Sequence, residues 1–545
     1  MGSVGNWKDL AAICVKIRDE STPQQWLLPA KALPQESQHN VLGAPAESGI
    51  LDAEELEMTE QDVSSLLEAY RTGRWTVRRV VTAFLKRATV MQQLTNFATE
   101  FLTEDALARA DELDEYFKST GKLIGPLHGV PVSVKEHVAI AGRITHAGFV
   151  SFIENEPPSE DSHVVQLLKK AGAVIHVRTN QPQSLMHLDC NNNITGMTLN
   201  PSHRLLSPGG SSGGEGASIG SRCAILGVGT DIGGSVRAPA AFNGVYGLRP
   251  TAQRIPGLGN VGLNPGQESI RGVVGPLGQS VGDLQAWMAA ILDQEPWEIE
   301  TNLMPIPWKK NVELDHVTIG VLWDDGIVKP HPPMIRALKT AAEKLKNAGI
   351  NVVDWEPLDH KKGWDIVAPL YFPDGGDRYL AEFAKTGEPA LPLTEHALNF
   401  AKKSGKTPLS VADNWALNYE REKYRREYHA LMNSRGVDFI LCPTYPGAGV
   451  LQGGAKYWNY TAIWNILDQP SAVFPSGLKV DKAVDVKDEG YVPRNEEDEA
   501  DWKAYDPDLF DGVPIALQLV GKRFNDEGVL EAVKLVESAL KSGGK

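Results

Sequence analysis

Apolar residues follow two different spacings along the chain, one typical of amphipathic helices and one typical of short buried strands. The helical spacing covers residues 51–98 and returns from Asp105 to Phe117. In the first of these regions, Thr59 to Asp62 has the pattern of a capping box, and Gly73 is suited to end a helix. Apolar runs of strand length occupy Gly129–Glu136, Ala173–Val177, Cys223–Asp231, Val317–Trp323, Ile350–Trp355, Asp438–Pro443 and Pro514–Gly521.

Two helix-to-strand units of similar pattern lie far apart in the chain. In HVVQLLKKAGAVIHVRTN the helix ends at Gly172, and in IRALKTAAEKLKNAGINVVDWE it ends at Gly349. Strands that alternate with helices predict an α/β protein whose mixed central sheet is surrounded by helices. No clean linker divides the chain, so we expect one large domain over 59–545, with a helical extension, 1–58, packed on it. The charged segment 480–508 is expected to be a surface excursion.

Composition narrows the partners and the compartment. The net charge is −15, from 54 basic and 69 acidic residues, which argues against nucleic acid as the main partner. No apolar run approaches the roughly 18 residues that span a bilayer. The first residues lack the apolar stretch of a signal peptide. The spacing of the four cysteines fits neither a disulfide framework nor a zinc site. We therefore expect a cytoplasmic protein with no transmembrane segment.

Two stretches, Ser207–Gly220 and Thr230–Pro239, carry glycine and serine at a density that ordinary helices and strands do not accept. A glycine inside an element costs about 0.5–1 kcal/mol relative to alanine, so repeated glycines indicate a backbone that approaches something closely. A phosphate loop is disfavoured, because the glycines are not followed by Lys and Ser or Thr, and no strand precedes Gly209. A nucleophile elbow at Ser211 or Ser212 lacks that strand too, and no downstream histidine has a catalytic context.

A third interpretation uses both stretches together with an upstream lysine. Ser211 and Ser235 each lie beside a pair of glycines, and a predicted strand between them can return the chain to one site. Unpaired backbone N–H groups at the turn before the following helix would form an oxyanion hole around a carbonyl attacked by Ser235. Lys135 ends an apolar strand, where burial would lower its pKa from about 10.4 and make it a base. A second serine could pass the proton between them.

The segment Gly209–Pro239 resembles the signature of the amidase signature enzymes in both order and spacing. Gly125–Glu136 and Gly512–Phe524 resemble two further blocks of that family, so the likeness runs from about residue 60 to the end of the chain. The N-terminal region, with QQLTNFATEF and ELDEYF, is most similar to fungal acetamidases. It also resembles fatty acid amide hydrolases, without the membrane-spanning start of the animal enzymes. The resemblance implies a single large amidase-signature domain.

The resemblance also implies roles for individual residues. Ser235 would be the nucleophile that forms the acyl-enzyme, Ser211 the bridging serine on a cis peptide bond, and Lys135 the general base and then acid. Substrate would be contacted by Ser211 and by the side chains of Leu185 and Met186, for which packing in the core is the alternative interpretation. The oxyanion hole would consist of the backbone N–H groups of Ile232, Gly233, Gly234 and Ser235. No metal ion or organic cofactor is implied.

Further residues around this site are expected to support it. Asp231 and Arg237 are interpreted as an ion pair that braces the loop. Ser212 and Thr230 are expected to orient Ser211 by hydrogen bonds. His128 and His137 flank the strand that bears Lys135 and are interpreted as structural histidines.

Together these features predict a serine hydrolase that cleaves a carboxamide to a carboxylate and ammonia through a Ser-Ser-Lys triad. Its partners would be a small amide and water, and a homodimer is compatible with the sequence. N-acyl or aryl amides, carbamates and esters remain alternative substrates, and a transamidating amidotransferase subunit is a further alternative. A catalytically dead binding protein is the alternative from another class, and the presence of all three triad residues argues against it.

Overall fold

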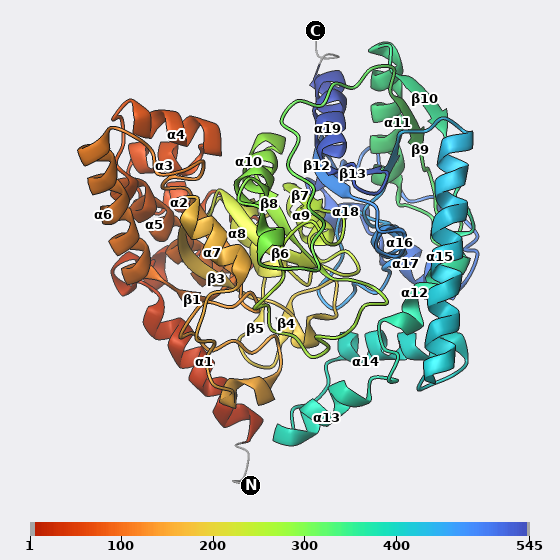
Figure 1. Cartoon of the computed structure of the whole chain (residues 1–545), viewed down its shortest axis with the longest axis horizontal. Coiled ribbons are helices and arrows are strands. Elements are labelled where there is room, and N and C mark those ends of the chain that lie inside the picture. The colour runs from red at the N-terminus through yellow and green to blue at the C-terminus, as the bar shows by residue number, and fades with distance from the viewer. Residues whose placement is uncertain (1–5, 542–545) are drawn as a thin grey trace.

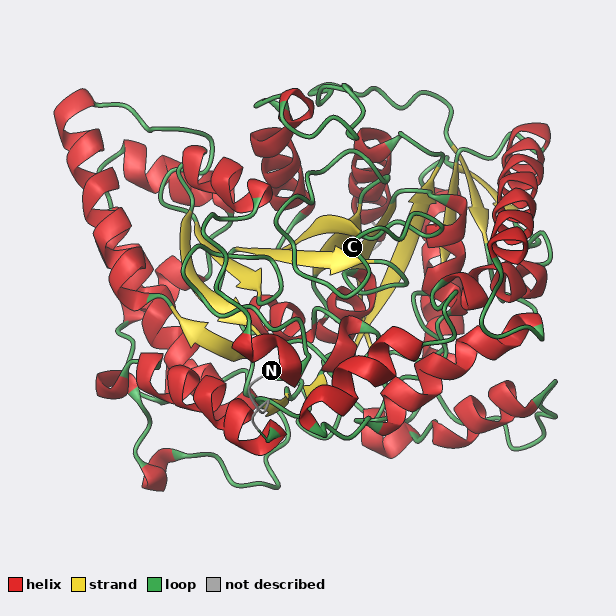
Figure 2. Ribbon diagram, turned by 60° about the horizontal axis from the view of Figure 1, so that its bottom comes forward, coloured by secondary structure: helices red, strands yellow, loops and turns green. Residues whose placement is uncertain are grey.

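One eleven-stranded sheet runs through the computed structural model, which describes residues 6–541 (Figures 1 and 2). The strands follow one another across it in this order: β1 (Ala98–Phe101), β3 (Val174–Thr179), β2 (Pro131–Lys135), β6 (Leu226–Asp231), β8 (Val273–Gly278), β7 (Tyr246–Arg249), β12 (Ser471–Lys479), β13 (Pro514–Gly521), β11 (Phe439–Cys442), β9 (Thr318–Val321) and β10 (Asn351–Asp354). A small separate pair consists of β4 (Asn191–Asn192) and β5 (Gly196–Met197).

The sheet has a parallel section on each side of an antiparallel middle, and its edge strand β1 pairs antiparallel with β3. Strand β2 pairs in parallel with β3 and β6, and β9 pairs in parallel with β10 and β11. Parallel neighbours need a crossover, and helices α7 (His163–Lys170) and α11 (Pro332–Asn347) lie in the connections from β2 to β3 and from β9 to β10. These are the two helix-to-strand units that the sequence predicts, and the predicted α/β class with a mixed sheet is confirmed.

Both faces of the sheet are covered, as the alternation of side chains along the strands shows. In β13, Ile515, Leu517 and Leu519 belong to the apolar core that includes α10, α11 and α19. Ala516 and Val520 belong instead to the core that includes α9, α12, α15 and α16. Since successive residues of a strand face opposite sides, a strand buried on both faces gives the continuous apolar run seen in the sequence.

The helices of the N-terminal part gather at one end of the sheet, and α15 lies at the other (Figure 1). Residue 58, where a boundary is predicted, lies within α3, and that boundary stays a prediction. The remaining α-helices are α1 (Trp7–Ser21), α2 (Ala44–Glu47), α3 (Ala53–Thr59), α4 (Val63–Arg71), α5 (Val77–Thr95), α6 (Thr103–Thr120), α8 (Gly213–Gly220), α9 (Arg237–Asn243), α10 (Val281–Leu292), α12 (His360–Leu370), α13 (Asp377–Thr386), α14 (Pro392–Leu398), α15 (Val411–Ser434), α16 (Asn459–Leu467), α17 (Glu496–Ala504), α18 (Pro507–Phe510) and α19 (Asp526–Lys541). Across residues 6–541, no helix has both the length and the apolar character needed to cross a membrane.

The predicted capping box at Thr59 to Asp62 is wrong. The box lies at the start of α3, where the side chain of Asp52 accepts from the N–H of Glu55 and the carboxylate of Glu55 accepts from the N–H of Asp52. Thr59 is the last residue of that helix, and Asp62 caps α4 alone. The second half of a box needs an acidic or amide side chain three residues after the cap, and Asp62 is followed there by Ser65.

Candidate active site

Lys135 and Ser211 meet where two parallel strands end. Lys135 is the last residue of β2, and the neighbouring β6 ends at Asp231, so both carboxyl ends lie at one edge of the sheet. The Nζ atom of Lys135 lies 2.7 Å from Ser211 Oγ and 3.0 Å from Thr230 Oγ1. The side chain is fully buried, and this burial lowers the pKa of Lys135 to about 7. A large fraction of this lysine is therefore neutral near pH 7 and able to accept a proton.

The backbone at Ser211 depends on the glycine before it. The peptide bond between Gly210 and Ser211 is cis, as the resemblance implies. A Cβ atom on Gly210 would lie 2.0 Å from the carbonyl oxygen of Asp189, a separation that no side chain can occupy. Part of the glycine-rich stretch therefore serves close packing of the turn that presents Ser211 to Lys135.

Asp231 holds the second glycine-rich turn from within. Its carboxylate receives two bonds of 3.0 Å from the guanidinium of Arg237, and both side chains are completely buried. It also accepts from the backbone N–H groups of Gly234 and Val236, at 2.9 and 3.1 Å. Burial alone would raise the pKa of Asp231, but Arg237 and the hydrogen bonds hold it well below its usual range. The carboxylate thus stays charged and fixes the turn.

The carbonyl groups of this turn are each held by a donor. Tyr371 Oη donates to the carbonyl of Ile232 at 3.0 Å, Thr461 Oγ1 to that of Gly233 at 2.6 Å, and the N–H of Ala238 to that of Gly234 at 2.7 Å. In a trans peptide the N–H points opposite to the carbonyl. The carbonyl contacts therefore set the direction in which each N–H of the turn points.

The hydrogen bonds of these N–H groups differ from the expected oxyanion hole at one residue, Gly234. The N–H of Gly234 is bound to Asp231, so it is not free to receive a substrate oxygen. Within residues 6–541, the N–H groups of Ile232, Gly233 and Ser235 have no protein acceptor. Three of the four expected donors are thus without a protein acceptor, and their role in an oxyanion hole stays a prediction. The N–H of Ser212 donates to the carbonyl of Ser235 at 3.1 Å, which joins the two glycine-rich segments.

The hydroxyl groups of Ser212 and Thr230 form hydrogen bonds with other groups than the expected partner, Ser211. The Ser212 hydroxyl lies 3.3 Å from the carbonyl oxygen of Thr230 and 3.2 Å from its backbone nitrogen. The hydroxyl of Thr230 contacts Lys135 and His137. In the part of the chain that the structure describes, neither hydroxyl bonds to the side chain of Ser211. Their contacts order the end of β6 and the lysine instead.

Leu185 and Met186 lie in and just after the short 3₁₀ helix η4 (Gln183–Leu185). Leu185 is half-buried and has a φ of 64°, whereas Met186 is buried. Both pack with the apolar core that includes α12 and α16. Their contact with substrate stays a prediction.

Several polar residues that hold the turn were not predicted. The guanidinium of Arg237 also donates to Gln518 Oε1, to Asn465 Oδ1 and to the carbonyl of Thr461. These partners come from β13 and α16, between 224 and 281 residues further along the chain than Arg237. The sequence contains one signal that could have identified such a partner: a single polar residue inside an apolar run, such as Gln518 in PIALQLVG. In a buried strand such a residue must find a hydrogen-bond partner.

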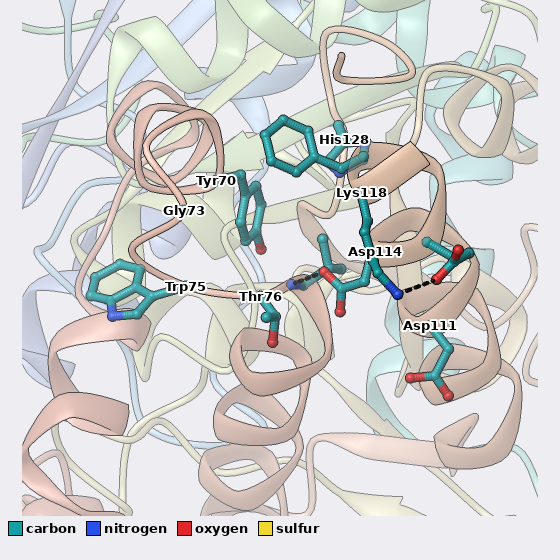
Figure 3. A pocket seen from close by; sticks show the side chains of 11 residues that line it. Tyr70, Gly73, Trp75, Thr76, Asp111, Asp114, Lys118 and His128 are labelled. Atoms are coloured by element: carbon teal, nitrogen blue, oxygen red, sulfur yellow. Dashed lines mark hydrogen bonds and ion pairs between the residues drawn. The ribbon is translucent and has the colours of Figure 1, made fainter. Parts of the chain in front are cut away.

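A surface cavity of about 440 Å³ between α4, α5 and α6 is separate from this site (Figure 3). His128 lines it and precedes the amino end of β2, whereas Lys135 lies at the carboxyl end. The Nδ1 atom of His128 accepts from the N–H of Ile124, which gives this histidine a structural contact. The carboxylate of Asp114 in the cavity accepts from the backbone N–H of Val77. Over residues 6–541, no group of three or more His, Cys, Asp or Glu side chains is arranged to hold a metal ion.

Comparison with known proteins gives consistent matches over nearly the whole chain. The family model described as Amidase matches residues 79–530. The protein C550.07 of Schizosaccharomyces pombe, which carries the name amidase, is 45% identical over 537 residues, covering 98% of this chain and 99% of that one. The acetamidase of Emericella nidulans is 37% identical and covers 98% of both chains. A solved structure of a fatty acid amide hydrolase is similar with a TM-score of 0.94 and 38% identity, covering 98% of this chain and 95% of that one.

Replacing Asp231 by Asn is expected to destabilise the protein strongly. The change leaves the buried guanidinium of Arg237 without a counter-charge, and breaking a buried pair in this way costs about 3–5 kcal/mol. Asp365→Asn is the matched control, since its partner Lys361 is exposed and such pairs contribute about 0–1 kcal/mol. The measurement is the denaturant midpoint of each variant. Equal midpoints for the two variants would contradict the role assigned to Asp231.

Proposed function

Since the chain belongs to the amidase family and is a hydrolase that acts on amides, we propose that it cleaves primary carboxamides to a carboxylic acid and ammonia. Ser235 is the nucleophile, Ser211 the proton relay and Lys135 the base in this proposal. The observation that carries it is the buried Nζ atom of Lys135 at 2.7 Å from Ser211 Oγ. A lysine whose pKa is about 7 is matched to general-base work at neutral pH.

In the first step, the lone pair of Lys135 takes the Ser211 proton while Ser211 takes the proton of Ser235. The Ser235 oxygen attacks the amide carbon, and the carbonyl electron pair moves to oxygen. The resulting oxyanion is stabilised by the free N–H groups of Ile232, Gly233 and Ser235. The ammonium of Lys135 then returns its proton through Ser211 to the leaving nitrogen, so the C–N bond breaks and ammonia departs.

The acyl-enzyme is hydrolysed by the same groups in the same order. Water loses a proton to Lys135 through Ser211 and attacks the ester carbon, which forms a second oxyanion in the same place. Collapse of this intermediate breaks the bond to the Ser235 oxygen, which recovers its proton from Lys135. The products are the carboxylic acid and the enzyme in its starting protonation state.

The similar proteins support two substrate ranges. The relatives named acetamidase favour small primary amides. The structural similarity to a fatty acid amide hydrolase favours amides with long acyl chains as a second candidate. Gly233 of the turn lies against aromatic side chains, since a Cβ there would be 3.0 Å from the Trp458 ring and 3.1 Å from the Tyr371 hydroxyl.

Variants of the triad test the mechanism directly. Ser235→Ala and Lys135→Ala are expected to lower kcat/KM for any cleaved amide by at least about 1,000-fold, because each removes a group that acts in both steps. Ser235→Ala should also abolish labelling by a fluorophosphonate probe. Ser218→Ala is the control, since that buried serine of α8 contacts Ser133. Full activity of the Ser235 variant would contradict the mechanism, and an unlabelled wild-type protein would favour a binding function.

A series of amides tests the substrate range. Acetamide and other short primary amides are expected to be cleaved with the higher kcat/KM, and aryl and long-chain amides with the lower. Ammonia release measures the primary amides, and carboxylate release measures the rest. A kcat/KM that rises steadily with acyl-chain length would favour the second candidate over the first.

The pH dependence of kcat/KM follows from the state of Lys135. Burial lowers the pKa of this lysine to about 7, so below that pH it is an ammonium and cannot accept a proton. Activity is therefore expected to rise from pH 5, to pass its midpoint near pH 7 and to level off above about pH 8. The measurement is a profile of kcat/KM in buffers of constant ionic strength. A flat profile from pH 5 to 9 would contradict the role of Lys135 as base.

A further inference from the structure

A line of hydrogen bonds leads away from Lys135 through its second contact, the hydroxyl of Thr230. Nζ of Lys135 lies 3.0 Å from Thr230 Oγ1, and the same oxygen lies 2.8 Å from Nε2 of His137. The other ring nitrogen of His137, Nδ1, lies 2.9 Å from the carbonyl oxygen of Val261. His137 is buried, and its own carbonyl accepts from the N–H of Val261, so its backbone is fixed against the same residue.

The carbonyl of Val261 determines the direction of every bond in this line. A carbonyl oxygen only accepts, so Nδ1 of His137 must carry a hydrogen. Burial, together with the charge of Lys135, lowers the pKa of His137 to about 3, so the ring is neutral and Nε2 has a lone pair. Thr230 must therefore donate its hydroxyl hydrogen to His137. Its oxygen is then left to accept from Lys135.

This direction matters because a neutral lysine has one lone pair. If the Thr230 hydroxyl could rotate, it could donate to that lone pair and compete with Ser211 for it. His137 prevents this, since the hydroxyl hydrogen is already bound. Thr230 then accepts from Lys135 whether the lysine is an amine or an ammonium, and nothing on this side has to rearrange as the proton moves.

We propose that His137 is a positioning residue, which acts through Thr230 to keep the Lys135 lone pair directed at Ser211. The inference rests on the proposed role of Lys135 as base. His137 itself does not exchange a proton in the reaction.

A double-mutant cycle tests this chain of action. His137→Leu removes the acceptor for Thr230 and is expected to lower kcat by about 10- to 100-fold with KM changed by less than about twofold, because alignment of the base is lost. Thr230→Val removes the hydroxyl and is expected to lower kcat as well. In the Thr230→Val background, His137→Leu should change kcat by less than about twofold. A purely structural role would instead give the same loss in both backgrounds.

Two further variants control for damage to the fold. His137→Gln keeps an oxygen that can accept from Thr230 and is expected to recover most of kcat, so the proposal stays testable if the leucine variant folds poorly. His176→Leu removes another buried histidine, whose Nε2 contacts the carbonyl of Cys223, and should lower stability without lowering kcat. Rates are measured per active site, titrated with a fluorophosphonate probe.

The outcomes separate this inference from the proposed function. A wild-type protein with no reactive serine, or an active Lys135→Ala variant, would overturn both. A labelled and active wild type whose His137→Leu variant keeps its kcat would overturn the positioning role alone. Equal losses in the two backgrounds of the cycle would also overturn it and leave the triad intact.

Discussion

The carboxylate of Asp231 and the guanidinium of Arg237 have no access to solvent, and the surrounding elements supply the contacts that offset this burial. Moving two charges out of water is costly, and attraction between them offsets the cost only when their remaining hydrogen bonds are also made. Here α16, β13 and the backbone N–H groups of Gly234 and Val236 supply the remaining hydrogen bonds. The second glycine-rich turn, which carries Ser235, is therefore held by a polar network that joins β6, α9, α16 and β13.

The same dry interior produces opposite results at different ionisable groups. Asp231 is surrounded by donors and a cation, so it stays ionised in spite of its burial. Lys135 is equally buried but contacts two neutral hydroxyls, so burial dominates and lowers its pKa. His137, next along the line, is neutral for the same reason. A buried group with a directly bound counter-charge, such as Asp231, therefore keeps its charge and fixes the turn. A buried group without one, such as Lys135, can exchange a proton.

The two parallel sections of the sheet and their crossover helices could be predicted from local sequence patterns. Long apolar runs such as Pro514–Gly521 mark strands buried on both faces, and glycine ends α7 and α11 in the expected places. Strands β7, β8 and β12 were not predicted, since they contain glycine or proline and owe their formation to pairing with distant neighbours. Tertiary pairing overrides local preference in such segments.

The candidate site, too, could be predicted only in part from the sequence. The glycine- and serine-rich turns were visible in the sequence because close packing restricts them to small residues, as at Gly210. The loss of the Gly234 N–H to Asp231 could not be predicted, because spacing does not say which side of a peptide faces a carboxylate. Tyr371 and Thr461 orient the turn, but the sequence does not distinguish their segments from other buried segments.

The place of β13 in the middle of the sheet has a consequence for how the protein matures. All three proposed triad residues occur before residue 236, yet Gln518 of β13 is among the last partners of Arg237 to be synthesised. Strand β13 lies between β12 and β11, both of which precede it in the chain, and the network includes a residue of β13. A chain still emerging from the ribosome therefore carries the reactive groups without the finished frame around them. The turn that carries Ser235 therefore depends on a segment that follows Arg237 by 281 residues.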